Sequence, residues 1–340
     1  MHPTPQISIV IPCRNERDYI GRCLDSIIRC DYDKSKLKVW VCDGLSDDGT
    51  IGIIKNYALE FPFIHYLENA HMTTPHALNI GLKATSFDIG VILGAHAEIY
   101  PDYLSNCVHV FQTHPEVDCV GGIIENENEH EKSEAIGAAM SSVFGVGNAH
   151  FRTGTKSGFV DTVAFGAYKK EVFETCGYFD EELVRNQDDE FNFRITDSGY
   201  KIWLEPSVRS KYYVRASFGK LRKQYYQYGY WKVYVNKKHG TVTTWRQTVP
   251  ALWISFLFLG YIPCLFLPPL WYGYLGTIVF YISASFLMAI KTAPKPRLVP
   301  KVLLSFWLLH LSYGSGYIKG LWDFFLLGKK PAEKQGRLSR

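Results

Sequence analysis

The sequence predicts an α/β domain with a mostly parallel sheet, followed by apolar helices that span a membrane. Short β-branched runs alternate with segments of helical apolar spacing in the N-terminal part, which is typical of βαβ units. Residues 247–290 contain no charged side chain, and residues 206–322 contain no Asp or Glu. Carboxylate chemistry is therefore expected in the N-terminal part of the 340-residue chain and membrane contact in the C-terminal part.

Four strands are expected early in the chain, because each is a short run rich in Val, Ile or aromatic residues. They cover residues 7–11, 37–42, 64–67 and 89–93. Apolar side chains recur at helical spacing in the segments that follow the first three strands, at 20–28, 51–57 and 75–83. Strands without polar alternation are buried on both faces, as in parallel sheets covered by helices.

Polar residues follow three of these strands at the point where each strand ends. Asn15 and Glu16 follow the first strand, Asp43 the second, and the stretch from His96 to Glu98 the fourth. Ligands of parallel α/β sheets bind at the carboxyl ends of the strands. We therefore expect these loops, although distant in sequence, to converge on one cleft.

The acidic stretch from Val184 to Arg194 is the main candidate for catalysis. It places three consecutive carboxylates, Asp188, Asp189 and Glu190, before apolar residues. A carboxylate held within reach of a substrate hydroxyl can act as a general base. The alternative is a solvated helix start, because Asp and Glu favour the first turn of a helix.

Four segments, in this order, resemble the family 2 glycosyltransferases, which are inverting enzymes of GT-A fold that use nucleotide-sugars. They are residues 9–16 (IVIPCRNE), 41–50 (VCDGLSDDGT), 77–81 (ALNIG) and 187–194 (QDDEFNFR). The pattern is closest to the succinoglycan-assembly branch of bacterial polysaccharide transferases. It implies a Rossmann-like GT-A catalytic domain over residues 1–210.

The resemblance also implies roles for individual residues. Asp188 becomes the catalytic base, Asp43 recognises the nucleotide base, a uracil, and Glu16 contacts the ribose. The other implied donor-binding residues are Pro12, Arg14, Asn79 and His96, and the implied acceptor-side residues are Asp161, Thr162, Asp189 and Arg194. An acceptor hydroxyl deprotonated by Asp188 would attack the anomeric carbon from the face opposite the leaving nucleoside diphosphate, which inverts the configuration of the sugar.

The metal-binding motif after the fourth strand departs from the family pattern. The family begins this motif with Asp, whereas this chain has Gly94. A divalent cation, Mg²⁺ or Mn²⁺, normally neutralises the leaving diphosphate and prefers oxygen ligands. His96 and Glu98 remain as candidate metal ligands, and the alternative for His96 is a polar residue at a strand end without a metal. Gln187 also replaces the usual acid before the base, which weakens like-charge coupling around Asp188.

Two further polar segments carry weaker signals. The acidic run at 125–131 is expected to be a solvated loop. Residues 145–158 combine four glycines with Arg152 and Lys156, which makes this segment a candidate for contact with a phosphate or with the acceptor. Its spacing matches no P-loop.

Residues 211–246 interleave Lys and Arg with Tyr and Trp. This composition suits either nucleic acid or a membrane surface. The apolar region that follows favours the membrane, so we expect a basic aromatic membrane-interface segment and no nucleic acid. The segment from Gln227 to Trp231 lacks the Arg of the family's processive Gln-x-x-Arg-Trp motif, which argues for transfer of one sugar per encounter.

Residues 247–328 are expected to form the membrane region, because a span needs about 20 apolar residues. Two spans are predicted at about 249–267 and 271–290, broken at Pro268 and Pro269, and the alternative is a buried hairpin of a soluble protein. The basic loop 291–297 is then cytosolic by the positive-inside rule. The apolar segment 302–327 is expected to be re-entrant, interfacial or a helical pair that returns the basic tail, 329–340, to the cytosol.

Together these features predict a membrane-anchored inverting glycosyltransferase with its catalytic domain on the cytosolic side, since no signal peptide is visible. The expected donor is a UDP-sugar and the expected acceptor a saccharide on a polyprenyl diphosphate in the bilayer. The alternative, motivated by Gly94, is a catalytically silent nucleotide-sugar-binding scaffold. A channel or transporter is disfavoured, because the spans carry no acidic residue for an ion path.

Overall fold

The computed structural model describes residues 4–147, 149–214 and 217–330. The chain forms two compact units, which are described separately. The first comprises residues 1–125 and 150–213, and the second comprises 126–149 and 214–340. The predicted catalytic domain, 1–210, therefore differs from the first unit mainly at 126–149. The predicted tail, 329–340, lies outside the described residues from 331 onward.

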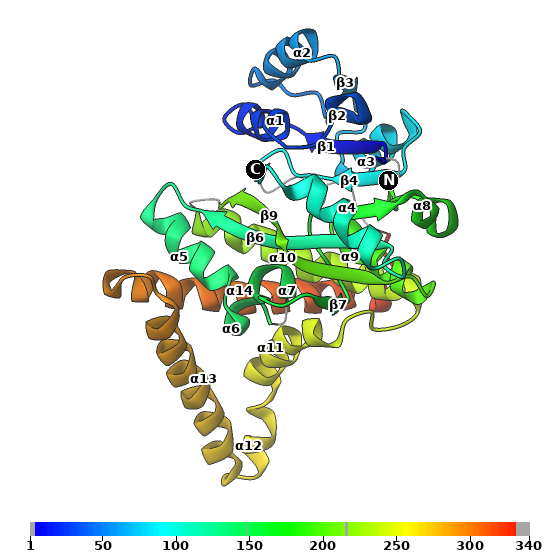
Figure 1. Cartoon of the computed structure of the whole chain (residues 1–340). Coiled ribbons are helices and arrows are strands. Elements are labelled where there is room, and N and C mark those ends of the chain that lie inside the picture. Colours follow the sequence, from blue (N-terminus) through cyan, green and yellow to red (C-terminus); the bar gives the residue numbers. More distant parts are fainter. Residues whose placement is uncertain (1–3, 148, 215–216, 331–340) are drawn as a thin grey trace. The chain divides into compact units, whose positions relative to one another are not determined.

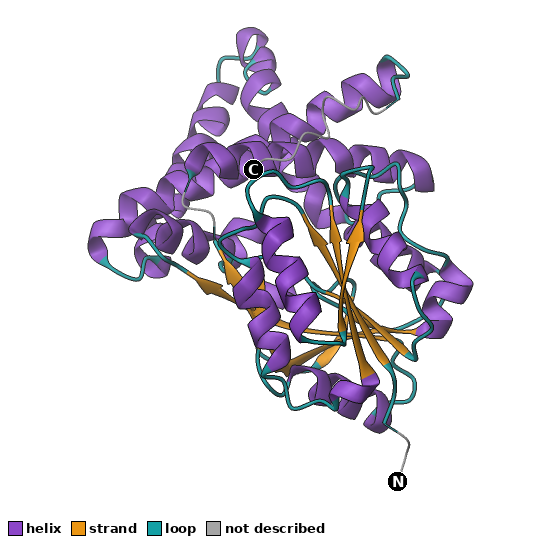
Figure 2. Cartoon of the chain, turned by 90° about the horizontal axis from the view of Figure 1, so that it is seen from above, coloured by secondary structure: helices purple, strands orange, loops and turns teal. Residues whose placement is uncertain are grey.

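The first unit contains a nine-stranded sheet in the order β3-β2-β1-β4-β8-β6-β9-β5, with β7 paired to β9 (Figure 1). The strands are β1 (Ile7–Cys13), β2 (Leu37–Asp43), β3 (Ile64–Glu68), β4 (Ile89–Ile92), β5 (Ala97–Ile99), β6 (Cys119–Glu127), β7 (Gly158–Val160), β8 (Ala167–Lys169) and β9 (Ile202–Tyr213). The four predicted strands form the parallel part, because β1 pairs in parallel with β2 and β4, and β2 with β3. The strands beyond β4 pair antiparallel, and the sheet is twisted (Figure 2).

Helices connect the strands as the apolar spacing predicted. Those of the first unit are α1 (Ile20–Ile28), α2 (Thr50–Glu60), α3 (Thr74–Lys83), α4 (Tyr103–Thr113), α7 (His150–Thr153), α8 (Lys170–Cys176) and α9 (Gln187–Asp197). Helix α3 packs closely on β1, since a Cβ at Gly81 would lie 2.4 Å from a methyl group of Val10. The α/β class is confirmed.

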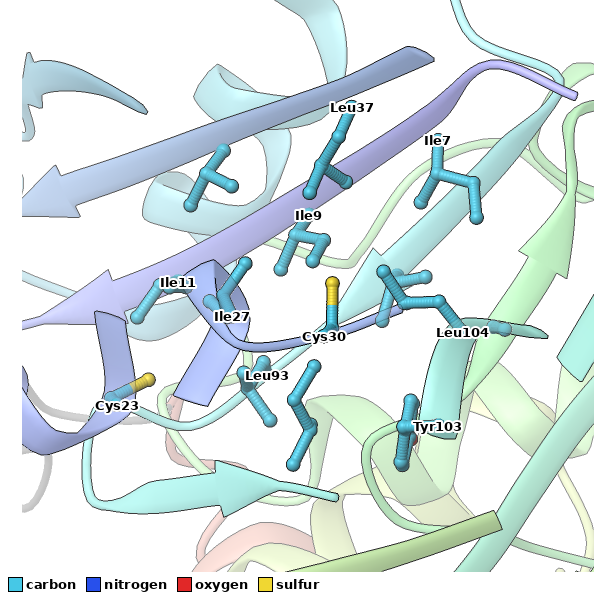
Figure 3. Close-up of a cluster of buried hydrophobic side chains, with 14 of the residues drawn as sticks. Ile7, Ile9, Ile11, Cys23, Ile27, Cys30, Leu37, Leu93, Tyr103 and Leu104 are labelled. Carbon is cyan, nitrogen blue, oxygen red and sulfur yellow. The ribbon is translucent and has the colours of Figure 1, made fainter. Parts of the chain in front are cut away.

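The core under the parallel part is formed mainly by β-branched and leucine side chains, together with cysteines and Tyr103, from the strands and from helices α1 and α4 (Figure 3). Ile9 and Ile11 of β1 and Leu24 and Ile27 of α1 are completely buried. Burial of such side chains contributes about 1.5–3 kcal/mol each. This packing holds β1 between β2 and β4. The predicted donor-binding residues Glu16, Asp43 and His96 lie at or just after the ends of these three strands.

The described residues of the second unit are mainly helical, and the end of β6 also belongs to this unit. Its helices are α5 (Glu131–Met140), α6 (Val143–Val146), α10 (Phe218–His239), α11 (Val249–Leu259), α12 (Ile262–Phe266), α13 (Leu270–Thr292) and α14 (Val299–Leu321). The acidic run expected to be a loop instead ends strand β6 and begins α5. The backbones of α10 and α14 approach closely, because a Cβ at Gly229 would lie 2.0 Å from the carbonyl oxygen of Tyr313.

Two helical segments, Trp245–Phe266 and Leu270–Thr292, are long and apolar enough to cross a membrane. Only 17% and 11% of their apolar windows are buried, so they are not core helices of this unit. They form a hairpin with α12 at its tip (Figure 1). The segment predicted at 302–327 is one helix, α14, continued by a π-helical turn at Trp322–Leu326, so the predicted helical pair is not formed.

Candidate active site

The loops after β1, β2 and β4 leave the sheet side by side. Cys13 pairs with Asp43 and Val10 with Ile92, so the three strands end at one edge. The first two loops are joined by hydrogen bonds, because the backbone N–H of Asn15 donates to Ser46 Oγ at 2.8 Å and that of Glu16 to Thr50 Oγ1 at 2.9 Å. The predicted convergence of these loops is therefore observed.

Asp43 is completely buried at the end of β2. Its carboxylate accepts hydrogen bonds from the backbone N–H and the hydroxyl of Ser46. Arg14 and Met72 lie over the neighbouring Gly44, with a Cβ there only 3.3 Å from each. Asp43 is thus held in a fixed orientation by Ser46, and its contact with a nucleotide base stays a prediction.

His96 lies where the loop after β4 meets the other two loops. Its Nδ1 is 3.4 Å from Oε1 of the buried Glu16, an ion-pair distance rather than a full hydrogen bond. Its ring packs against the ring of Tyr212 in a T-shaped arrangement, with the two ring centroids 4.9 Å apart. On the same tyrosine, the Arg152 guanidinium lies 5.4 Å from the ring centroid. Glu16, His96, Tyr212 and Arg152 form one continuous group, the strand-end cluster.

The second predicted metal ligand, Glu98, contacts Tyr213 and Arg29. The hydroxyl of Tyr213 donates a hydrogen bond to Glu98, and Arg29 lies 3.9 Å from its carboxylate. Burial, and then this hydrogen bond, raise the pKa of Tyr213. Within residues 4–147, 149–214 and 217–330, no three His, Cys, Asp or Glu side chains are placed to hold a metal ion.

Gly94 itself leaves no room for a carboxylate without movement. A Cβ at this position would lie 3.0 Å from Cε1 of Phe165. The backbone of Phe165 is held in place, because its carbonyl oxygen accepts a hydrogen bond from the hydroxyl of Tyr103. The residues at this strand end therefore do not fit the divalent cation that the family pattern implies.

The predicted catalytic residue, Asp188, lies in the first turn of α9 and is exposed. Asn186 precedes the helix with φ of +60°, a left-handed conformation that Asn tolerates. Asp188 also contributes, after burial and Cys119, to raising the pKa of the buried Tyr168, so its carboxylate lies near that phenol. Asp189 is half-buried. Asp188 is therefore the outward-facing acid of the three.

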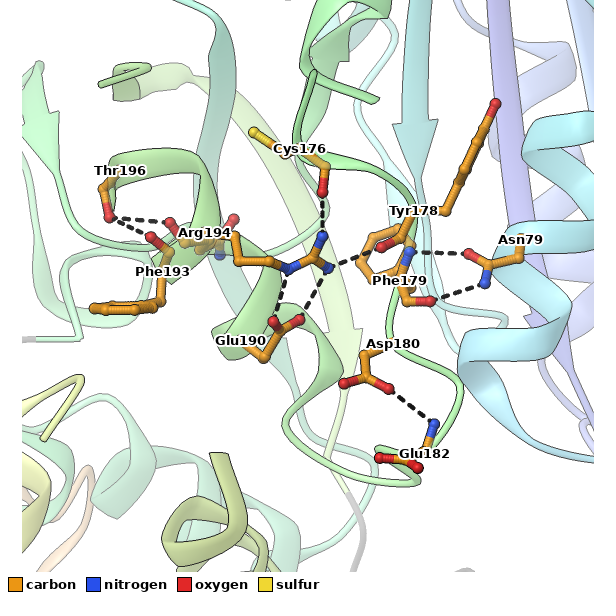
Figure 4. A network of polar contacts seen from close by, with 11 residues as sticks. Asn79, Cys176, Tyr178, Phe179, Asp180, Glu182, Glu190, Phe193, Arg194 and Thr196 are labelled. Carbon is orange, nitrogen blue, oxygen red and sulfur yellow. Dashed lines mark hydrogen bonds and ion pairs between the residues drawn. The ribbon is translucent and has the colours of Figure 1, made fainter. Parts of the chain in front are cut away.

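Glu190, the third acid, is 3% exposed and points into the protein. Arg194 binds it in a bidentate pair, with Nε–Oε1 at 2.6 Å and Nη2–Oε2 at 2.9 Å. The same guanidinium donates to the carbonyl oxygens of Cys176 and Tyr178 (Figure 4). Arg194 thus anchors α9 to the preceding loop, and its acceptor-side role stays a prediction.

Asn79 anchors the other end of that loop. Its amide oxygen accepts from the backbone N–H of Phe179 at 3.0 Å, and its amide nitrogen donates to the carbonyl of Phe179 at 2.8 Å (Figure 4). The same nitrogen also donates to Glu181 at 2.8 Å. Asn79 is 4% exposed. It therefore acts as a clamp on residues 179–181 in this structure, and its donor contact stays a prediction.

The predicted acceptor-side pair lies beside α9. Thr162 Oγ1 accepts a hydrogen bond of 2.8 Å from Asn192, a completely buried residue of that helix. Asp161 is exposed. Sequence reasoning missed Asn192 and the inward role of Glu190, although Glu190 and Arg194 stand at the i, i+4 spacing of a helical ion pair.

The chain is similar to known glycosyltransferases. Residues 8–177 match the Glycosyl transferase family 2 domain. A dolichyl N-acetyl-α-D-glucosaminyl phosphate 3-β-D-2,3-diacetamido-2,3-dideoxy-β-D-glucuronosyltransferase of Methanococcus voltae is 30% identical over 93% of this chain and 97% of its own. The succinoglycan biosynthesis protein ExoA of Rhizobium meliloti is 28% identical over 71% of this chain and 73% of its own.

The solved structures give the same fold. A mannosyltransferase from Pyrobaculum calidifontis, determined with GDP-mannose and Mn²⁺, superposes with a TM-score of 0.61 at 20% identity and covers 95% of this chain and 88% of its own. The predicted GT-A fold is confirmed. The chain belongs to glycosyltransferase family 2.

Proposed function

We propose that this glycosyltransferase moves a sugar, with inversion, from a UDP-sugar to a lipid-linked saccharide in glycan assembly, with Asp188 as the general base. The observation that carries the proposal is the placement of Asp188. It is exposed on the first turn of α9, while Glu190 and Arg194 of the same helix are fixed in the protein. A base must be both accessible to the acceptor and held in position.

In the proposed reaction, Asp188 takes the proton of an acceptor hydroxyl. The hydroxyl oxygen forms a bond to the anomeric carbon as the bond from that carbon to the nucleoside diphosphate breaks on the opposite face. The bonding electrons leave with the diphosphate, and the configuration inverts. Asp43 and Glu16 would hold the base and ribose at the strand ends, with Pro12 and Arg14 beside them, while Asp161, Thr162 and Asp189 would face the acceptor.

The lipid-linked acceptor is supported by the second unit and by the relatives. Two helices expose apolar side chains over lengths that suit a bilayer. The Methanococcus voltae relative acts, by its name, on a dolichyl-phosphate-linked sugar, and the Rhizobium meliloti relative serves succinoglycan biosynthesis. We extend this to a multi-span membrane protein with a cytosolic catalytic unit and a polyprenyl-diphosphate acceptor.

The test is transfer of labelled sugar from a panel of UDP- and GDP-sugars into the lipid-extractable fraction of membranes that carry the protein. Asp188→Asn should abolish transfer, while Asp189→Asn, its half-buried neighbour, should retain most of it. Loss with Asp189→Asn and retention with Asp188→Asn would assign the base to Asp189. Transfer by the native chain would also exclude the silent-scaffold alternative that Gly94 suggested.

A further inference from the structure

We propose that Asn192 is a positioning residue that ties the acceptor-side segment 161–163 to the helix that carries Asp188. The inference rests on the proposed function, in which Asp188 is the general base and this segment faces the acceptor. A base must keep a fixed distance from the hydroxyl that it deprotonates, so the surface that binds the acceptor must keep its place relative to the base. Asn192 joins the two by hydrogen bonds.

The side chain of Asn192 contacts both a side chain and the backbone of this segment. Its amide nitrogen donates to Thr162 Oγ1 at 2.8 Å and to the carbonyl oxygen of Val163 at 3.3 Å. Its amide oxygen accepts from the hydroxyl of Tyr168, 3.5 Å away. Asn192 is completely buried, so these bonds form away from water, where they are stronger and where their loss is more costly.

The segment itself is fixed on the sheet. Val163 is 2% exposed, and a Cβ at Gly121 of β6 would lie only 2.3 Å from the Cβ of Val163. The glycine at this position therefore allows the segment to pack directly on the strand. Asn192 thus joins α9 to a part of the chain that the sheet holds in place.

Asp188 stands one helical turn before Asn192. At the spacing i, i+4 the two side chains are neighbours on the helix, with Asp188 exposed at the start of α9 and Asn192 buried. The hydroxyl of Tyr168 bonds Asn192. Burial, then Cys119 and then Asp188 raise the pKa of this phenol, so Asp188 lies near it too. The hydrogen-bonded connection and the base therefore share one turn of the helix.

Apolar packing alone would not specify how α9 meets this segment. Phe191 and Ile195 of the same helix are completely buried, but burial of apolar surface is non-directional. Hydrogen bonds have preferred distances and angles, so the amide of Asn192 specifies the position of the helix against segment 161–163. Loss of this amide should therefore leave a folded protein in which the acceptor is misplaced relative to the base.

The experiment measures two quantities for the full-length protein in detergent. The first is the affinity for UDP or GDP, whichever belongs to the active donor, by calorimetry. The second is the rate at which labelled sugar enters lipid extracted from native membranes, per mole of protein that binds the nucleotide. Asn192→Leu has a similar volume but cannot donate, so it should lower this rate about tenfold or more. Its affinity for the nucleotide should change by less than about threefold.

Variants of Thr162 and a matched control complete the design. Thr162→Val removes the oxygen that Asn192 reaches and should also lower transfer, whereas Thr162→Ser keeps this oxygen and should retain the native rate within about threefold. The control is Ser26→Ala, because Ser26 is also buried on a helix: its hydroxyl donates to the carbonyl of Cys23 and accepts from the backbone N–H of Ile99 in β5. Ser26→Ala should lower Tm and leave transfer per folded protein unchanged.

The double variant Asn192→Leu with Thr162→Val tests the connection itself. Its loss of transfer should match the larger of the two single losses, because both substitutions remove the same hydrogen bond. A loss equal to the product of the single losses would overturn the inference, since the two side chains would then act separately.

Native rates of transfer in Asn192→Leu would overturn the inference while leaving the proposed function intact. The same holds if Ser26→Ala loses as much transfer per folded protein as Asn192→Leu. If Asn192→Leu does not fold, as shown by failure to bind the nucleotide, Thr162→Val decides, and a native rate in that variant would also overturn the inference. Absence of transfer by the native protein from every donor would instead overturn the proposed function, and the inference with it.

Discussion

Replacement of Arg194 by Met should strongly destabilise the first unit, which contains helix α9. The substitution leaves the carboxylate of Glu190, 3% exposed, without its bidentate partner and removes the hydrogen bonds to the carbonyls of Cys176 and Tyr178. Removal of one partner of a buried pair costs about 3–5 kcal/mol, mainly because a buried charge is left uncompensated. For a unit of this size, each kcal/mol shifts Tm by about 2–4 °C. We therefore expect Tm to fall by about 6–20 °C.

Thermal unfolding of the full-length protein in detergent measures this effect, and two variants control it. Lys170→Met breaks another i, i+4 pair, Lys170–Glu174 at 2.8 Å, whose side chains are 49% and 57% exposed, so its effect on Tm should be far smaller than that of Arg194→Met. Adding Glu190→Gln to Arg194→Met removes the uncompensated charge, so the double variant should be more stable than Arg194→Met alone. If Arg194→Met unfolds like Lys170→Met, or the double variant is the less stable, the anchoring argument is refuted.

Two other predictions concern the clamp and the sheet edge. Asn79→Ala should lower kcat without weakening UDP binding, because the three lost hydrogen bonds position residues 179–181, which precede α9. Weaker binding of UDP by this variant would instead support a contact between Asn79 and the donor. Burial, and then Lys38, hold the pKa of His65 below its usual 6.5, so the folded chain takes up this proton less readily than the unfolded chain. The stability that His65 contributes is present above pH 6.5 and is lost as the pH falls through the lowered pKa. Between about pH 7 and pH 5, the Tm of the native protein should fall more steeply than that of His65→Phe, and equal slopes would contradict this.

The parallel part of the sheet could be predicted because each of its strands is a short run rich in β-branched and aromatic residues. β1 has seven residues that are almost all buried, and a strand of this apolar character is expected inside a sheet that helices cover on both faces. The convergence of Glu16, Asp43 and His96 then follows from topology alone. Elements of three residues, such as β5, β7 and β8, carry too little pattern to reveal their antiparallel pairing.

The sequence indicated where the candidate site residues lie in the fold, but not which side chains they contact. The hydrogen bonds of Asn79 join residues 100 apart in sequence, so no local pattern reveals that its amide is engaged within the protein. The same is true of Arg152 and Tyr212, which meet only through the fold. The pairing of Glu190 with Arg194 is different, because its i, i+4 spacing is visible in the sequence once the segment is assigned to a helix.

The three consecutive acids on α9 differ in exposure because they point in different directions around the helix axis. Successive residues are rotated by about 100°, so Asp188 and Glu190 project about 200° apart around the helix axis. One carboxylate is therefore exposed while the other is buried against Arg194, although the two are alike in charge. The buried pair fixes the rotation of the helix, and that rotation determines where Asp188 points. A base on the first turn of an anchored helix can thus remain accessible to a bulky acceptor without losing its orientation, which a base on an unanchored loop could not do.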